Sequence, residues 1–167
     1  AASAALTPLL RSIGHLALSN GRRTQRALPT GSSFSSERSS VATRKPRIAI
    51  TVGDPAGIGP EVAQKAVSDP RVRDVCEPVL YGPPHGARFE PGALSPAAGR
   101  AAYEAIFSAV RDALGATVDG IATAPVNKMA FAMAGLPWKG HTELLAYLTV
   151  SARVAMMFWS EPLKVVL

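Results

Sequence analysis

A glycine-rich loop is the first segment of this 167-residue chain whose residues could do chemistry. A short apolar run, with the β-branched residues of a buried strand, leads into Gly53-Asp54-Pro55-Ala56-Gly57-Ile58-Gly59-Pro60-Glu61. Glycines let a ligand approach the backbone amides closely. Pro60 suits the first position of a helix, and Glu61 complements the positive end of the helix dipole. The pattern is typical of a ligand-binding turn, and an ordinary strand-to-helix turn is the alternative.

A second group of chemically capable residues lies downstream of this loop. It comprises Thr123-Ala124-Pro125-Val126-Asn127-Lys128 and then Gly140-His141-Thr142-Glu143. The glycine spacing of the first loop matches neither the dinucleotide fingerprint nor the phosphate-binding P-loop. The functional interpretation of that loop therefore depends on this second, independent group.

Strands and helices are predicted to alternate around both groups. The predicted strands cover residues 48–52, 78–82, 118–124, 154–159 and 163–167, and the predicted helices cover 60–67, 95–114, 128–134 and 142–149. This order indicates an α/β domain with a largely parallel sheet and flanking helices, whose ligands collect at the carboxyl ends of the strands. The short link between the last two strands favours an antiparallel pair.

The formal charge of +6 is concentrated at one end of the chain. Residues 1–47 hold eight Lys or Arg and one acid, whereas the remaining 120 residues hold ten Lys or Arg and eleven acids. The folded part therefore shows no basic groove for nucleic acid. No segment approaches the roughly 20 apolar residues that span a bilayer. The single cysteine, Cys76, permits no intrachain disulfide. We expect neither a nucleic acid nor a membrane as partner.

Residues 1–45 are rich in Ser, Ala and Arg and are expected to be largely disordered. Their composition is that of an organellar transit peptide, with a non-native extension as the alternative. We expect a cytoplasmic protein, or an organellar one if this leader is a transit peptide. The folded part is expected to cover residues 46–167. Because the chain stops inside an apolar strand, we interpret it as the N-terminal part of a longer, truncated α/β domain.

The motifs together resemble the 4-hydroxythreonine-4-phosphate dehydrogenase family, which acts in pyridoxine and pyridoxal phosphate biosynthesis. The resemblance rests on residues 48–61, 123–128, 140–143 and 156–157, in that order and spacing. It implies the isocitrate/isopropylmalate dehydrogenase-like fold and a homodimer when the protein has its full length. The segment between Gly82 and Gly99 is shorter than is usual in the family, so the cap over the substrate is expected to differ.

The resemblance implies an oxidoreductase that oxidises 4-phosphohydroxy-L-threonine with NAD and then releases carbon dioxide. Such chemistry needs a divalent metal, here Zn, Mg or Co, to polarise the reacting oxygen. In the family three histidines hold the metal, one of them from the partner subunit, and all would lie outside this chain. No metal ligand is therefore expected within it, and the truncated chain is expected to be inactive alone.

The resemblance also implies roles for six residues. His141 and Thr142 would bind the substrate, because an imidazole and a hydroxyl can donate to anionic oxygens where a helix begins. Lys128 would be a charge partner for the substrate, with a solvated surface lysine as the alternative. The cofactor would be bound, or the cleft lined, by Asp54, Gly57 and Gly59. No residue is assigned as a catalytic acid or base.

Three other functions stay open. Related threonate or erythronate phosphate dehydrogenases share these motifs, which leaves the substrate undecided. A catalytically inactive truncated fragment would bind a phosphorylated ligand only weakly. A phosphate acyltransferase of similar fold is the third alternative, and the segment Gly140-His141-Thr142-Glu143 argues against it.

Overall fold

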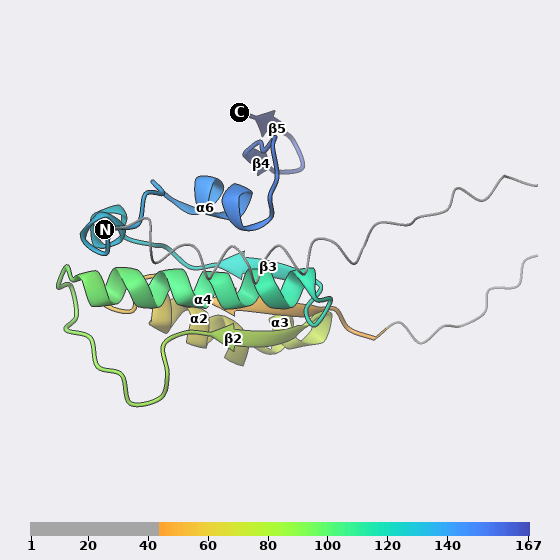
Figure 1. Ribbon diagram of the computed structural model, residues 1–167. Coiled ribbons are helices and arrows are strands. Elements are labelled where there is room, and N and C mark those ends of the chain that lie inside the picture. Colours follow the sequence, from red (N-terminus) through yellow and green to blue (C-terminus); the bar gives the residue numbers. More distant parts are fainter. Residues whose placement is uncertain (1–43) are drawn as a thin grey trace, which may run out of the picture. The chain divides into compact units, whose positions relative to one another are not determined.

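A computed structural model describes residues 44–167, and residues 1–43 of the predicted leader lie outside the described residues. Lys45–Leu167 make one compact unit. In chain order its elements are β1 (Arg47–Thr51), α2 (Gly59–Ser68), α3 (Pro70–Val75), β2 (Glu77–Tyr81), α4 (Pro96–Leu114), β3 (Gly120–Thr123), α5 (Lys128–Met133), α6 (His141–Leu148), β4 (Met157–Trp159) and β5 (Lys164–Val166) (Figure 1). The predicted alternation of strands and helices is confirmed.

Strands β2, β1 and β3 form a parallel sheet in that order, with β1 at its centre. Ala49 pairs with Val79 on one side and with Ile121 on the other. Backbone hydrogen bonds continue past both strand ends, from Val52 to Tyr81 and from Ala124 to Thr51. The carboxyl ends of all three strands therefore lie at one edge of the sheet, as the sequence predicted.

Helices cover both faces of this sheet because alternate residues of β1 point to opposite sides. Ala49 packs with Ala109 of α4 and with Val118, whereas Ile50 and Val52 pack with Ala63 of α2. Figure 1 shows α4 running along one face of the sheet. Burying one side chain of the size of Ile or Val stabilises the fold by about 1.5–3 kcal/mol.

Helix α4 has the predicted bounds, and a side-chain cap explains where it begins. The Ser95 hydroxyl accepts a 3.1 Å hydrogen bond from the Ala98 amide and so caps the first turn. Gly99 lies against α5, where a Cβ atom would overlap the carbonyl oxygen of Ala130. The small residue therefore allows the backbones of α4 and α5 to approach each other closely.

Several predicted boundaries differ from the structure by one or two residues, and the short helix α3 was not predicted. Helix α2 begins at Gly59, so Pro60 is its second residue rather than its first, and Glu61 lies in the first turn as predicted. Helix α5 ends at Met133 rather than at Ala134, and α6 begins at His141 rather than at Thr142. Helix ends are the least certain part of any such prediction.

Strands β4 and β5 form an antiparallel hairpin, as predicted, although both are shorter than expected. Met157 pairs with Val166, and the amides of Met156 and Leu167 continue the pairing. Within the described residues the hairpin contacts no other helix or strand, and its Met157, Phe158 and Trp159 side chains are exposed. Separately, no helix in residues 44–167 is long and apolar enough to cross a membrane.

Candidate functional site

The loop after β1 and the loop after β3 are in direct contact at the carboxyl edge of the sheet. The Asp54 amide donates a 2.9 Å hydrogen bond to the Pro125 carbonyl oxygen. Gly53 has a φ of +65°, and a Cβ atom there would overlap the carbonyl oxygen of Pro125. Glycine is therefore required at this position both by its backbone conformation and by the neighbouring loop. The structure brings the first loop into contact with the segment that follows β3.

Within the first loop, two of the three predicted residues have structural contacts of their own. The Asp54 carboxylate is buried, and its Oδ1 accepts a 2.9 Å hydrogen bond from the Ala56 amide. A Cβ atom at Gly59 would overlap the Val52 carbonyl oxygen, so Gly59 allows α2 to start directly against the strand. Gly57 is exposed, and a Cβ atom there would have no neighbour nearer than 3.5 Å. The contact of these residues with a cofactor stays a prediction.

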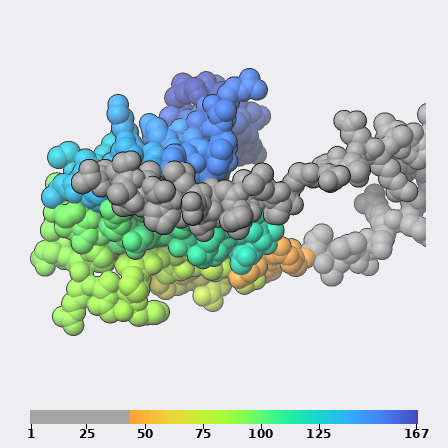
Figure 2. Space-filling model, viewed as in Figure 1, coloured from red at the N-terminus to blue at the C-terminus, as the bar shows by residue number. Residues whose placement is uncertain are grey.

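A pocket of about 660 Å³ opens between the first loop and the segment that follows β2. This volume is within the range of small-molecule sites. Its lining residues are Val52, Pro55, Pro60, Pro83, Ala87, Arg88, Phe89 and Glu90. Figure 2 shows the segment between β2 and α4, in yellow-green, projecting from the body of the described chain. The pocket borders the first motif, but Lys128, His141 and Thr142 do not line it.

The second motif begins α5 through a side-chain cap that the sequence reasoning missed. Asn127 Oδ1 accepts hydrogen bonds from the amides of Met129 (2.9 Å) and Ala130 (3.2 Å). An Asn immediately before a predicted helix is a recognisable signal for this arrangement. The cap fixes the first turn of α5, from which the exposed Lys128 side chain extends. Lys128 has no ion-pair or hydrogen-bond partner among the described residues.

His141 is the first residue of α6 and is partly buried. Its Nε2 atom is buried and has no hydrogen-bond partner within residues 44–167. Burial lowers the pKa of the imidazole, so the side chain is neutral at pH 7. A buried polar atom without a partner is costly, and a ligand that supplies the partner would remove that cost. This orphan nitrogen supports a binding role for His141.

The start of α6 offers further groups to an anion. Gly140 precedes the helix and provides no side-chain cap, so the first amides of the helix are not satisfied from within it. Thr142 is exposed, and its hydroxyl can donate a hydrogen bond. Glu143 lies in the first turn, where a carboxylate stabilises the helix dipole, as predicted.

An aromatic cluster joins the segment before α6 and the last turn of α6 to α4. The Trp138 ring lies 5.5 Å from the Tyr103 ring, with an interplanar angle of 2°, and 5.0 Å from the Tyr147 ring. Tyr103 belongs to α4 and Tyr147 to α6, so one side chain joins both helices three residues before His141. The sequence analysis did not identify Trp138, since no local pattern links it to Tyr103.

The arrangement around α6 is suited to binding an anion rather than to transferring a proton. No carboxylate contacts His141 within the described residues, so the imidazole lacks the orienting partner of a typical general base. In residues 44–167 no group of three or more His, Cys, Asp or Glu side chains could hold a metal ion. The described residues therefore do not fit a metal by themselves, and we assign no step through one.

Comparisons with known proteins point to one family. Residues 33–167 match the family model described as pyridoxal phosphate biosynthetic protein PdxA. A 4-hydroxythreonine-4-phosphate dehydrogenase from Desulforapulum autotrophicum is 32% identical, over 76% of this chain and 49% of the relative. A D-threonate 4-phosphate dehydrogenase from Cupriavidus necator is 34% identical, over 72% of this chain and 48% of the relative.

A solved structure gives the same result for the fold. The crystal structure of a 4-hydroxythreonine-4-phosphate dehydrogenase from Burkholderia phymatum matches with a TM-score of 0.65 and 32% identity. The match covers 74% of this chain and 49% of that protein. The chain spans about half the length of the curated relatives that it matches.

Proposed function

We propose, from the premise that the chain belongs to the PdxA family of pyridoxal phosphate biosynthetic proteins, that the whole protein is a dehydrogenase of a phosphorylated hydroxy acid. Its relatives named above are dehydrogenases of such acids. The observation that carries the proposal is the buried, unpartnered Nε2 of His141 at the start of α6. This buried polar atom belongs to the first residue of α6, and an anionic substrate bound at that helix start would supply the missing partner.

The preferred substrate is 4-phosphohydroxy-L-threonine, oxidised with NAD and then decarboxylated. D-threonate 4-phosphate is the second candidate, because a relative named for it is 34% identical to this chain. An erythronate phosphate is a further variant of the same class. Each candidate carries a phosphate and a secondary alcohol, so the same cationic and hydrogen-bonding groups would serve them.

The residues of this chain would bind and orient the substrate. His141 and Thr142 would contact an anionic oxygen at the start of α6, and Lys128 would supply a positive charge from the start of α5. NAD, when bound, would accept the hydride. Asp54, Gly57 and Gly59 would shape the loop on the cofactor side of the cleft, with the buried Asp54 carboxylate holding that loop in place.

Several features of the whole protein belong to this proposal as well. We propose a homodimer located in the cytoplasm, or in an organelle if residues 1–45 are a transit peptide. The divalent metal, Zn, Mg or Co, would be held by residues outside this chain. We propose that residues 1–45 are a leader or extension to a domain that starts at residue 46. An inactive fragment is the alternative, and residues 1–167 alone are expected to form no NADH.

The proposal is tested by the change His141→Ala in the whole protein, assayed by NADH formation from both phosphorylated substrates. Loss of one hydrogen bond to a charged group, worth about 1.5–3 kcal/mol, should lower kcat/KM about ten- to a hundredfold. The melting temperature should change little. The control is Lys164→Ala, which alters an exposed residue of β5, outside both motifs.

Two results would contradict the proposal. The first is that the unaltered whole protein forms no NADH from either substrate in the presence of Zn, Mg or Co. The second is that His141→Ala lowers the melting temperature but leaves the kinetics of the remaining folded protein normal. In that case His141 would be a packing residue.

A further inference from the structure

We propose that Lys139 is a specificity-determining residue that recognises the phosphate group of the substrate, together with Lys128. This inference rests on the proposed function, because it assigns a further residue to the same site. Lys139 immediately precedes Gly140, the N-cap of α6, and is two residues before His141, where the helix begins. Its side chain is exposed and has no ion-pair or hydrogen-bond partner among residues 44–167.

The residue before Lys139 is packed against two helices. The preceding residue, Trp138, stacks on Tyr103 of α4 and contacts Tyr147 of α6. The following residue, Gly140, is the N-cap of the helix that begins with His141. Lys139 therefore lies in the short link between the packed Trp138 ring and the start of α6, and its long side chain would lose conformational freedom when it binds an anion.

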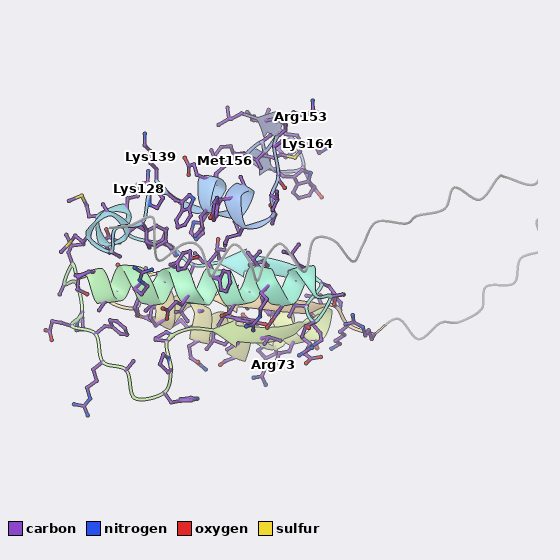
Figure 3. All side chains as sticks on the ribbon, viewed as in Figure 1. Arg73, Lys128, Lys139, Arg153, Met156 and Lys164 are labelled. Atoms are coloured by element: carbon purple, nitrogen blue, oxygen red, sulfur yellow. The ribbon has the colours of Figure 1, made fainter. Side chains whose placement is uncertain are left out.

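Most basic side chains elsewhere in the described chain already have partners. Arg47 pairs with Glu77, Lys65 with Glu61, and Arg71 with Asp69. Backbone carbonyl oxygens accept hydrogen bonds from another set of basic side chains: Lys45, Arg73 and Arg100. Within residues 44–167 the side chains of Lys128 and Lys139 have no such partner, and in Figure 3 both extend away from the sheet, on the side where α5 and α6 lie.

The charge around the start of α6 fits a doubly charged ligand. A phosphate monoester carries about −1.5 to −2 charges at pH 7 and offers three acceptor oxygens. Lys128 and Lys139 supply two positive charges, and the α6 amides add the positive end of a helix dipole. One acidic residue, Glu143, lies in the first turn of α6, and its Oε2 atom lies 3.9 Å from the position that a Cβ atom would take at Gly140. The two lysines and this one carboxylate together leave a net positive charge for the anion.

The first test is a titration of the 167-residue chain with inorganic phosphate, followed by NMR through the amides of Gly140 and His141. Lys139→Gln should weaken phosphate binding about three- to tenfold, because an exposed lysine loses its charge contact but little packing. Lys139→Arg should restore most of the affinity. The matched control is Lys164→Gln, which removes an exposed and unpaired lysine from β5.

The second test uses the whole protein with 4-phosphohydroxy-L-threonine and with 4-hydroxy-L-threonine, which lacks the phosphate. Lys139→Gln should raise KM for the phosphorylated substrate and leave kcat nearly unchanged, because a residue that binds phosphate equally in the ground and transition states affects binding alone. Turnover of the unphosphorylated compound should not change. The selectivity for the phosphorylated substrate should therefore fall.

The outcomes separate this inference from the proposed function. If Lys139→Gln matches the unaltered protein in both tests while His141→Ala loses activity, Lys139 has no role and the proposed function stands. If the unaltered whole protein oxidises neither compound, the proposed function is overturned, and a Lys139-dependent affinity for phosphate would still support the anion site. An equal loss of affinity in Lys139→Gln and Lys164→Gln would overturn the inference, since it would reflect net charge only.

Discussion

The Asp54 amide and the Pro125 carbonyl oxygen are joined by a 2.9 Å hydrogen bond between two loops that follow different strands. This bond continues the pairing of β1 and β3 beyond the end of the sheet. The adjacent Gly53 has a left-handed backbone conformation, and its Cα lies against the carbonyl oxygens of residues 124 and 125. The loops after β1 and β3 therefore form one structural unit, and a change in one loop should alter the conformation of the other.

Gly53→Ala tests this unit. The added methyl group would overlap the Pro125 carbonyl oxygen, and alanine disfavours a φ of +65°. We expect a loss of about 2–4 kcal/mol in the free energy of unfolding, measured by urea denaturation. Gly57→Ala is the matched control, since it meets no close neighbour, and it should change stability by less than about 1 kcal/mol. Equal stabilities for the two variants would show that the loops do not depend on this contact.

Trp138→Ala tests the aromatic stack that anchors α6. Removing a partly buried indole from between Tyr103 and Tyr147 should cost about 1–3 kcal/mol of stability and speed amide exchange in α6. Trp138→Phe should keep most of the stability. Trp159, whose side chain is 66% exposed on β4, provides the control, and Trp159→Ala should change stability by less than about 0.5 kcal/mol. Unaltered exchange in α6 of Trp138→Ala would contradict the anchoring role.

The protonation of His141 gives a prediction on pH. Burial lowers the pKa of His141 in the folded chain, so below its ordinary value of about 6.5 the unfolded chain binds the proton more readily. The contribution of His141 to stability is therefore present above about pH 6.5 and is lost as the pH falls through the lowered pKa. An NMR titration of the imidazole should show this directly, and phosphate should raise the pKa. A ligand-free His141 that titrates above 6.5 would refute the assignment.

Deletion of residues 1–44 tests the proposed leader. A disordered segment contributes no buried area, so the melting temperature of residues 45–167 should match that of the whole chain within about 2 °C. Differential scanning calorimetry of both chains measures this. A melting temperature several degrees lower after the deletion would mean that the leader packs on the domain.

Local patterns explain how much of the fold could be predicted. The strand before Gly53 and helix α4, with its Ser95 cap, depend on side-chain alternation, periodicity and capping within a few residues. Both were predicted with nearly correct bounds. The match of residues 33–167 to the PdxA family and the likeness to the Burkholderia phymatum structure confirm the family resemblance and the α/β fold class. The order and spacing of the short motifs were sufficient to identify the family and the fold class.

The residue types of the candidate site were readable from the chain, but their surroundings were not. An imidazole at a helix start was evident from Gly140 and His141, whereas the burial and lack of a partner of its Nε2 depend on how α6 packs. Likewise, Gly59 suggested a ligand approach, and the structure instead places the Val52 carbonyl oxygen against it.

Contacts between residues far apart in the chain account for the rest. Asp54 meets Pro125 only when β1 pairs with β3, and Trp138 meets Tyr103 only when the segment before α6 packs on α4. Periodicity and capping report which side of an element is apolar, but not which partner covers it, because many apolar partners bury similar area. The chain therefore specified its elements and its reactive groups locally, and the choice of neighbours that positions them was made by tertiary packing.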